Sequence, residues 1–111
     1  MPEARLFAPA GTTPWTEVAP GNRRRVLVYT TELMQVEFAF EPGAIGAPHS
    51  HPHVQSSYIA EGRFEVTIDG HTETLGTGSS FIVPSNLVHG VKALEAGRLI
   101  DSFTPARADF L

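Results

Sequence analysis

Residues 43–62 read GAIGAPHSHPHVQSSYIAEG, and the remainder of the chain is organised around this stretch. It holds three histidines and a glutamine between glycine-bounded turns, and a further suitably placed histidine follows at His89. Imidazole nitrogens suit first-row divalent metals, and a carboxamide oxygen can complete such a ligand set. We therefore predict that residues 43–62 form the ligand-bearing hairpin of a small β-barrel, with a divalent metal held inside.

The candidate metal ligands are His49, His51, Gln55 and His89. His49 and His51 are two residues apart, so in an extended strand they project to the same side. Gln55 keeps that parity if the strand continues past Pro52. His89 must then face the same interior from a separate strand. The other two histidines, His53 and His71, are interpreted as ordinary surface residues.

Length and composition favour one small all-β domain. The chain has 111 residues, enough for a single modest core. Its 10 glycines and 9 prolines are spread along the sequence, which suits many short strands joined by tight turns. The net charge of −4 argues against a nucleic-acid partner, because phosphate binding needs a basic patch. We interpret the one basic run, Arg23 to Arg25, as a solvated strand entrance.

The absence of cysteine limits the possible metal ligands, and the hydropathy of the chain bears on its cellular compartment. The sequence contains no cysteine, so a metal must be bound through nitrogen and oxygen. No apolar run is long enough to span a membrane, and the first residues lack the pattern of a secretory signal. We therefore expect a soluble cytoplasmic protein without a membrane partner.

The chain divides into a short arm and a barrel. Four prolines within residues 1–22 forbid a continuous helix there. We predict an N-terminal arm over residues 1–22, anchored by Trp15 and lying across a sheet or a partner subunit. A single β-barrel domain is expected over residues 23–111.

Alternation of apolar and polar residues predicts half-buried strands over 34–40 and 64–68. Asp69-Gly70 predicts a hairpin turn, and Asn86 can adopt the positive φ that a turn after Pro84 requires. Turn signals recur about every eight to twelve residues, without a long helical pattern, as in all-β barrels and jelly rolls.

The last strand carries a candidate acid. Leu99, Asp101 and Phe103 share one face of a strand expected over residues 99–103. If Leu99 points into the barrel, Asp101 does too, and its carboxylate lies beside the metal cavity. Buried acids are rare without a partner, so an inward Asp101 is a functional candidate with a shifted pKa. The alternative is the opposite orientation of the strand, with Asp101 solvated.

The histidine stretch resembles the first cupin motif: glycine, five residues, His-x-His, three residues, acid, six residues, glycine. The matching positions are Gly43, His49, His51, Gln55 and Gly62, with Gln55 in place of the usual glutamate. The second cupin motif is matched by Gly78, Pro84, Asn86 and His89, with Asn86 replacing a glycine and Ala93 the closing asparagine. The resemblance spans about residues 33–103 and implies a single-domain cupin jelly-roll β-barrel.

A more specific resemblance is to the KdgF family of small cupins, which act in pectin and alginate breakdown. It is carried by LIDSFTPARADFL at the C-terminus, HSHPHVQ in the centre and RRRVLVY near the start. It implies ring opening (linearisation) of 4,5-unsaturated monouronates to 4-deoxy-5-keto uronate, so the expected partner is a small anionic sugar acid. It also implies a metal held by His49, His51, His89 and Gln55, and activity that depends on Asp101, Phe103 and Arg107.

Several alternatives stay open. A neutral Gln55 leaves a divalent site with more positive charge than a glutamate would, which favours an anionic ligand and Lewis-acid chemistry. The metal is nickel, zinc, iron, manganese or cobalt, because histidine and glutamine ligands accept each of them. Arg107 either pairs with the substrate carboxylate or forms a surface salt bridge with a nearby acid such as Asp109.

A non-catalytic binding or sensing cupin and an iron-dependent cupin dioxygenase are the rival functions. By analogy with cupins of this size, we expect a homodimer that exchanges residues 1–22.

Overall fold

The computed structural model describes residues 4–111, so the first three residues of the expected arm lie outside the described residues. The strands are β1 (Thr16–Ala19), β2 (Asn22–Tyr29), β3 (Met34–Phe40), β4 (Ile45–His49), β5 (Val54–Glu61), β6 (Arg63–Ile68), β7 (His71–Gly76), β8 (Ser80–Val83), β9 (His89–Ala93) and β10 (Gly97–Thr104). A short 3₁₀ helix, η1 (Ala108–Phe110), follows β10. In this part of the chain, no helix is long and apolar enough to cross a membrane.

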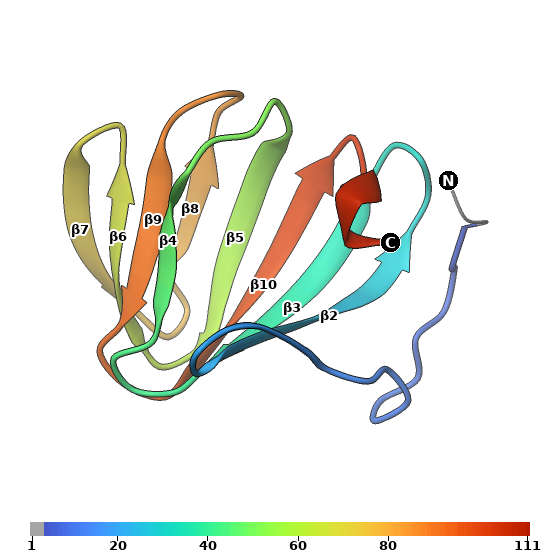
Figure 1. Ribbon diagram of the computed structural model, residues 1–111, viewed down its shortest axis with the longest axis horizontal. Coiled ribbons are helices and arrows are strands. Elements are labelled where there is room, and N and C mark those ends of the chain that lie inside the picture. Colours follow the sequence, from blue (N-terminus) through green and yellow to red (C-terminus); the bar gives the residue numbers. More distant parts are fainter. Residues whose placement is uncertain (1–3) are drawn as a thin grey trace.

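The strands form two antiparallel sheets. One has six strands in the order β1-β2-β3-β10-β5-β8, and the other has four in the order β4-β9-β6-β7. Figure 1 shows the four-stranded sheet gathered on one side, with β5, β10, β3 and β2 curving away on the other. This arrangement confirms the expected all-β jelly-roll fold.

The core lies between the two sheets and follows the alternation of the strands. One cluster is built around Phe40, Ile59, Phe64 and Leu99. A second cluster joins β3 to the C-terminal segment through Met34, Val36, Phe103 and Ala106. Each of these side chains is at most 6% exposed. The strands expected over 34–40 and 64–68 are both present, within the bounds of β3 and β6.

The turns follow local backbone chemistry. Asp69 and Gly70 have φ values of 49° and 81° and join β6 to β7, as the Asp-Gly pair predicts. Asn86 has φ of 67°, which confirms that it takes the left-handed conformation in the turn before β9. Both positions therefore obey rules that act over a few residues.

The prediction of a hairpin over residues 43–62 is wrong. β4 belongs to the four-stranded sheet and pairs with β9, whereas β5 belongs to the six-stranded sheet and pairs with β10 and β8. The chain crosses from one sheet to the other between His49 and Val54. Pro52 lies in this crossing, and its missing N–H cannot continue a strand ladder. The extended-strand parity therefore does not hold through His51, which lies in the crossing itself.

Residues of the expected arm run alongside β2. The backbone groups of Arg5 and Tyr29 exchange two hydrogen bonds of 2.9 and 3.0 Å, and β1 pairs with β2. The Trp15 ring packs beneath two guanidinium groups, 4.6 Å from that of Arg23 and 4.0 Å from that of Arg25.

The interpretation of Arg23 to Arg25 as a solvated entrance is right only for Arg23. Arg23 is exposed, whereas Arg24 and Arg25 are half-buried. Successive residues of a strand point to opposite faces. Arg24 therefore shares the inner face of β2 with Asn22, and Arg25 lies on the outer face, where it binds Glu37.

Candidate metal centre and adjoining cavity

Three histidines from separate segments converge at one end of the molecule. His49 is the last residue of β4, His51 lies in the crossing between the sheets, and His89 opens β9. His49 and His89 are register partners, and their ring centroids are 4.4 Å apart. One ring nitrogen of each histidine lies within 4.8 Å of the corresponding atoms of the other two. This spacing suits a single shared cation.

Backbone carbonyl groups orient all three rings. Each Nδ1 donates to a carbonyl oxygen two residues away: His49 to Ala47 at 2.8 Å, His51 to His53 at 2.9 Å and His89 to Leu87 at 2.9 Å. Because a carbonyl oxygen only accepts, Nδ1 carries the proton and Nε2 keeps a free lone pair. Within residues 4–111, Nε2 of His89 is buried and has no hydrogen-bond partner. The triad therefore presents unprotonated nitrogens to a common centre.

The protonation state of the buried histidines supports the same conclusion. Burial lowers the pKa values of His51 and His89, and their hydrogen bonds to backbone carbonyls offset this only in part. The positive charges of neighbouring groups, including Arg107, lower both pKa values further. Both rings are therefore neutral at pH 7, which is the form that binds metal.

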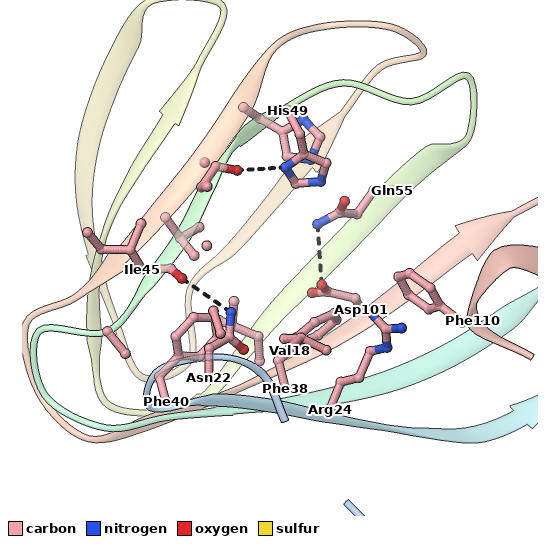
Figure 2. A pocket seen from close by; sticks show the side chains of 18 of the residues that line it. Val18, Asn22, Arg24, Phe38, Phe40, Ile45, His49, Gln55, Asp101 and Phe110 are labelled. Atoms are coloured by element: carbon pink, nitrogen blue, oxygen red, sulfur yellow. Dashed lines mark hydrogen bonds between the residues drawn. The ribbon is translucent and has the colours of Figure 1, made fainter. Parts of the chain in front are cut away.

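Gln55 extends the donor set from β5. Its Oε1 lies 3.1 Å from Nε2 of His51. Since the His51 proton is on Nδ1, these two atoms are both acceptors, and they repel each other unless a cation lies beside them. Gln55 Nε2 donates to Ser57 Oγ at 3.0 Å and to Asp101 Oδ2 at 3.3 Å, as Figure 2 shows for Asp101. Three imidazole nitrogens and one amide oxygen thus fit a divalent metal.

Asp101 lies beneath this cluster on β10. Leu99, Asp101 and Phe103 are 3%, 4% and 2% exposed, so the inward orientation of this face is confirmed and the solvated alternative is wrong. Burial raises the pKa of Asp101 to about 7, against the lowering effect of a hydrogen bond from Ser57. Its Oδ1 is buried and has no partner among the described residues. The carboxyl group therefore keeps its proton to much higher pH than an ordinary aspartate does, and it has one oxygen free.

A cavity of about 620 Å³ joins these groups. Its walls include His49, Gln55, His89 and Asp101. Binding pockets for small molecules typically measure about 300–1,000 Å³, so a monosaccharide fits within it. Figure 2 shows Arg24, Asp101 and Phe110 toward one end, and Asn22, Phe40 and Ile45 toward the other. At this second end Asn22 donates to the Ile45 carbonyl at 3.3 Å, while its buried Oδ1 has no partner within residues 4–111.

Arg107 and Phe103 also line the cavity. Arg107 donates from Nε and Nη2 to the two carboxylate oxygens of Asp109, at 3.0 and 2.8 Å. The salt bridge foreseen as an alternative for Arg107 is therefore present, although the side chain also faces the cavity. The Phe103 ring lies 5.7 Å from the ring of His51 and 5.3 Å from the Arg107 guanidinium.

The other two histidines lie outside the triad. His71 is exposed on β7, as expected, and its Nε2 lies 3.7 Å from Glu73. His53 lies outside the ligand cluster too, but it is half-buried rather than exposed, with its ring centroid 5.6 Å from that of His51. Its carbonyl group accepts the hydrogen bond that orients the His51 ring.

Asn22, Arg24 and Phe110 are among the cavity residues that the sequence did not reveal. Two of them could have been found by extending the alternation of β2 backward from Val26, which contacts the core. Phe110 carried no such signal, because it reaches the cavity from η1 beyond the last strand.

Comparison of the sequence with known proteins identifies a family and a close relative. Residues 36–103 match the family model described as the cupin domain. The pectin degradation protein KdgF of Dickeya dadantii (strain 3937) is 46% identical over 101 residues, which cover 89% of this chain and 92% of that protein.

Solved structures agree with this comparison. The structure of KdgF from Halomonas sp. is 38% identical with a TM-score of 0.92, over 96% of this chain and 99% of that one. The crystal structure of an RmlC-like cupin from Shewanella frigidimarina NCIMB 400 is 40% identical with a TM-score of 0.95, over the full length of both chains.

Proposed function

The chain belongs to the cupin family, and we propose that it is a metal-dependent enzyme that opens the ring of 4,5-unsaturated monouronates. The product is the open-chain 4-deoxy-5-keto uronate formed in pectin or alginate breakdown. Similarity to the KdgF proteins over nearly the whole chain supports this proposal. The observation that carries it is the buried Asp101 carboxyl group, which has a free oxygen and lines the same cavity as His49 and His89 of the histidine triad.

The metal ligands in this proposal are His49, His51 and His89 through Nε2, and Gln55 through Oε1. A divalent metal bound there supplies Lewis-acid charge that holds oxygen atoms of an anionic ligand. Nickel, zinc, iron, manganese and cobalt all accept this donor set. The neutral Gln55 keeps the charge of the site high, which favours a sugar acid over a neutral sugar.

Asp101 moves the proton in the proposed reaction. As a general base, it takes the proton of the anomeric hydroxyl group, and the C1–O5 bond breaks as the C1 carbonyl forms. The electron pair left on O5 gives an enolate across C4 and C5, and proton return to C4 yields the 5-ketone. No atom is gained or lost. A carboxyl group with pKa about 7 can accept and return a proton near neutral pH.

Phe103 and Arg107 complete the proposed site. Phe103 is 2% exposed and walls the cavity beside His51, which excludes water from the reacting groups. The two oxygens of Asp109 occupy Nε and Nη2 of Arg107, and Nη1 is left to contact the substrate carboxylate. Asp109 also fixes the guanidinium plane, so that little side-chain freedom is lost when a ligand binds.

The test is loss of the ultraviolet absorbance of the unsaturated uronate after mixing with the metal-loaded protein. We expect Asp101→Asn to lower the rate by about 10²–10⁴-fold, because it removes acid–base catalysis. Bound metal should stay unchanged, since Asp101 is not a proposed ligand. Asp69→Asn, which alters an exposed turn acid, is the matched control and should keep full activity. Full activity of Asp101→Asn would contradict the assignment.

The same experiment separates the rival functions. Binding of the uronate without absorbance loss favours a sensing cupin, and oxygen uptake during turnover favours a dioxygenase. Metal content should be measured on every sample, so that an inactive preparation is not mistaken for an inactive protein. The expected result is absorbance loss without oxygen uptake.

The expected assembly and compartment stay predictions. A homodimer is supported by the apolar side chains that the N-terminal segment leaves uncovered, Leu6 at 67% and Phe7 at 82% exposed. A cytoplasmic location is the expectation from the sequence alone.

A further inference from the structure

Arg24 is a charged residue of the cavity wall that has no role in the proposed reaction. It lies on the inner face of β2 between Thr16 of β1 and Phe38 of β3. Its side chain lines the same cavity as His49, Gln55 and Asp101. A strand on each side of β2 fixes its backbone, so the direction of this side chain is set by the sheet.

Arg25, on the outer face of the same strand, is neutralised, but Arg24 is not. Arg25 binds Glu37 at 2.7 Å on the outer face. Among the ion pairs formed within residues 4–111, none involves Arg24. A half-buried guanidinium without a carboxylate partner is costly, unless an anion completes its surroundings.

A second cation increases this need. The guanidinium groups of Arg24 and Arg107 lie 3.8 and 4.2 Å from the centroid of the Phe110 ring. Asp109 forms an ion pair with Arg107, so its single negative charge is the one that faces both guanidinium groups, and it leaves a net positive charge beside Phe110. Burial and the nearby charge of Arg107 both lower the pKa of Arg24, and the charge of Asp109 compensates only in part.

The stacking on Phe110 also prepares Arg24 to bind a planar anion. A guanidinium that lies over an aromatic ring is restrained by that contact while its N–H groups remain free at the edge. Two parallel hydrogen bonds from such an edge match a carboxylate. Figure 2 shows the Arg24 side chain extending from β2 towards Phe110 and Asp101.

We propose that Arg24 binds the carboxylate group of the cavity's ligand and thereby determines specificity for sugar acids over neutral sugars. The inference rests on the proposed function in one respect only, namely that the ligand is a sugar acid. It assigns to Arg24 the two-bond recognition of that carboxylate, and it leaves Arg107, whose fork is largely occupied by Asp109, with a single contact from Nη1.

The test measures binding rather than turnover. D-galacturonate and D-galactose, which lack the C4–C5 double bond, are titrated into the metal-loaded protein, and binding is followed by NMR chemical-shift changes. We expect the wild type to prefer galacturonate by at least about tenfold. Arg24→Met should weaken galacturonate binding by about ten- to a hundredfold, the range for a lost charge-assisted hydrogen bond, and leave galactose binding unchanged.

Two further variants make the result specific. Arg23→Met removes the same charge from the adjacent position on the outer face, and should bind both sugars as the wild type does. Arg24→Lys keeps the charge but loses the fork, so it should fall between the wild type and Arg24→Met. It also replaces Arg24→Met if that variant does not fold, and its affinity for galacturonate should then fall by several-fold relative to the wild type.

Three results would overturn the inference. The wild type binds neither sugar, or it binds both equally well. The third is that every Arg24 variant that folds binds galacturonate as tightly as the wild type does. Failure of the proposed function has a different signature. In that case the wild type still prefers galacturonate through Arg24, but the absorbance of the unsaturated uronate does not change.

Discussion

The protonated nitrogens of the three histidines are set by carbonyl groups two residues away along the chain. Such short-range bonds fix the tautomer of each ring before any metal arrives, and the metal then meets three free lone pairs. A buried acceptor without a partner destabilises the fold, and Nε2 of His89 is such an atom among the described residues. At the scale of single residues, the site therefore has the donor geometry of a metal centre.

Replacing His89 tests this geometry. His89→Ala removes one nitrogen donor, so we expect metal affinity to fall by more than about a hundredfold, beyond the effect of losing an outer hydrogen bond. Metal content after equilibration with a competing chelator, read by elemental analysis, is the measurement. His71→Ala, at an exposed histidine outside the triad, should bind metal as the wild type does. Equal metal content in the two variants would exclude His89 as a ligand.

Glu37 ties three strands together on the outer face of the six-stranded sheet. It lies on β3, accepts from Arg25 of β2 at 2.7 Å and is also paired with Arg98 of β10. Burial alone would raise the pKa of Glu37, but the hydrogen bonds from Arg98 and Arg25 outweigh it, and the pKa is lowered. The carboxylate form is thus favoured more in the folded than in the unfolded state.

The sign of the pH dependence follows from this lowered pKa. The contribution of Glu37 to the free energy of unfolding is fully present above the ordinary glutamate pKa of about 4.3, and is lost as pH falls through the folded value. We expect Glu37→Gln to destabilise the fold by about 1–3 kcal/mol at pH 7, and by less in acid. Urea unfolding at several pH values measures this. Glu32→Gln, at an exposed turn, is the control and should leave the profile unchanged.

Gly97 opens β10 at a place where the two sheets approach closely. A Cβ at this position would lie 2.6 Å from the carbonyl oxygen of Glu61 and 2.7 Å from the Phe64 ring. We expect Gly97→Ala to destabilise the protein by about 1–3 kcal/mol, the usual cost of overpacking.

Gly76 provides the matched control, because its φ is not positive and a Cβ added there would meet no described atom within 4 Å beyond its chain neighbours. Gly76→Ala should be neutral, or stabilising by up to about 1 kcal/mol, since alanine loses less backbone freedom on folding. The midpoints of thermal unfolding of Gly97→Ala and Gly76→Ala are the measurement. Equal midpoints would show that β10 can shift away from Glu61 at little cost.

At the scale of the whole molecule, the N-terminal segment is the part whose apolar side chains are least covered. Leu6 and Phe7 are 67% and 82% exposed, although Arg5 beside them is bonded to β2. Burying two such side chains against a second copy would favour association. This is the physical basis for expecting a homodimer that exchanges its N-terminal residues.

Light scattering after size-exclusion chromatography tests this assembly. We expect a mass of twice 12.0 kDa for the wild type. The double variant Leu6→Ser, Phe7→Ser should shift the population towards the monomer, because it removes the apolar contact area. Leu33→Ser, which alters an exposed leucine in the turn before β3, is the control and should remain dimeric. A monomeric wild type would contradict the prediction.

Much of the fold could be predicted from short-range patterns. The alternation over 34–40 and the Asp69-Gly70 turn depend on strand periodicity and on which residues tolerate a positive φ. The parity of Asp101 with Leu99 showed that the two side chains share one face, but only their burial in the structure decided that this face points inward. The hairpin over 43–62 could not be judged in this way, because adjacent strands in the chain need not be partners in a sheet.

Groups a few residues apart define the strand pattern, the turn positions, the donor types and the spacing of the histidines, so these features can be read along the chain. Which groups meet depends on long-range packing. Gln55 reaches Asp101 across 46 positions of sequence, and Arg24 meets Phe110 from the opposite end of the chain. Such contacts follow from how two whole sheets pack, a free energy summed over the entire core that no local pattern contains.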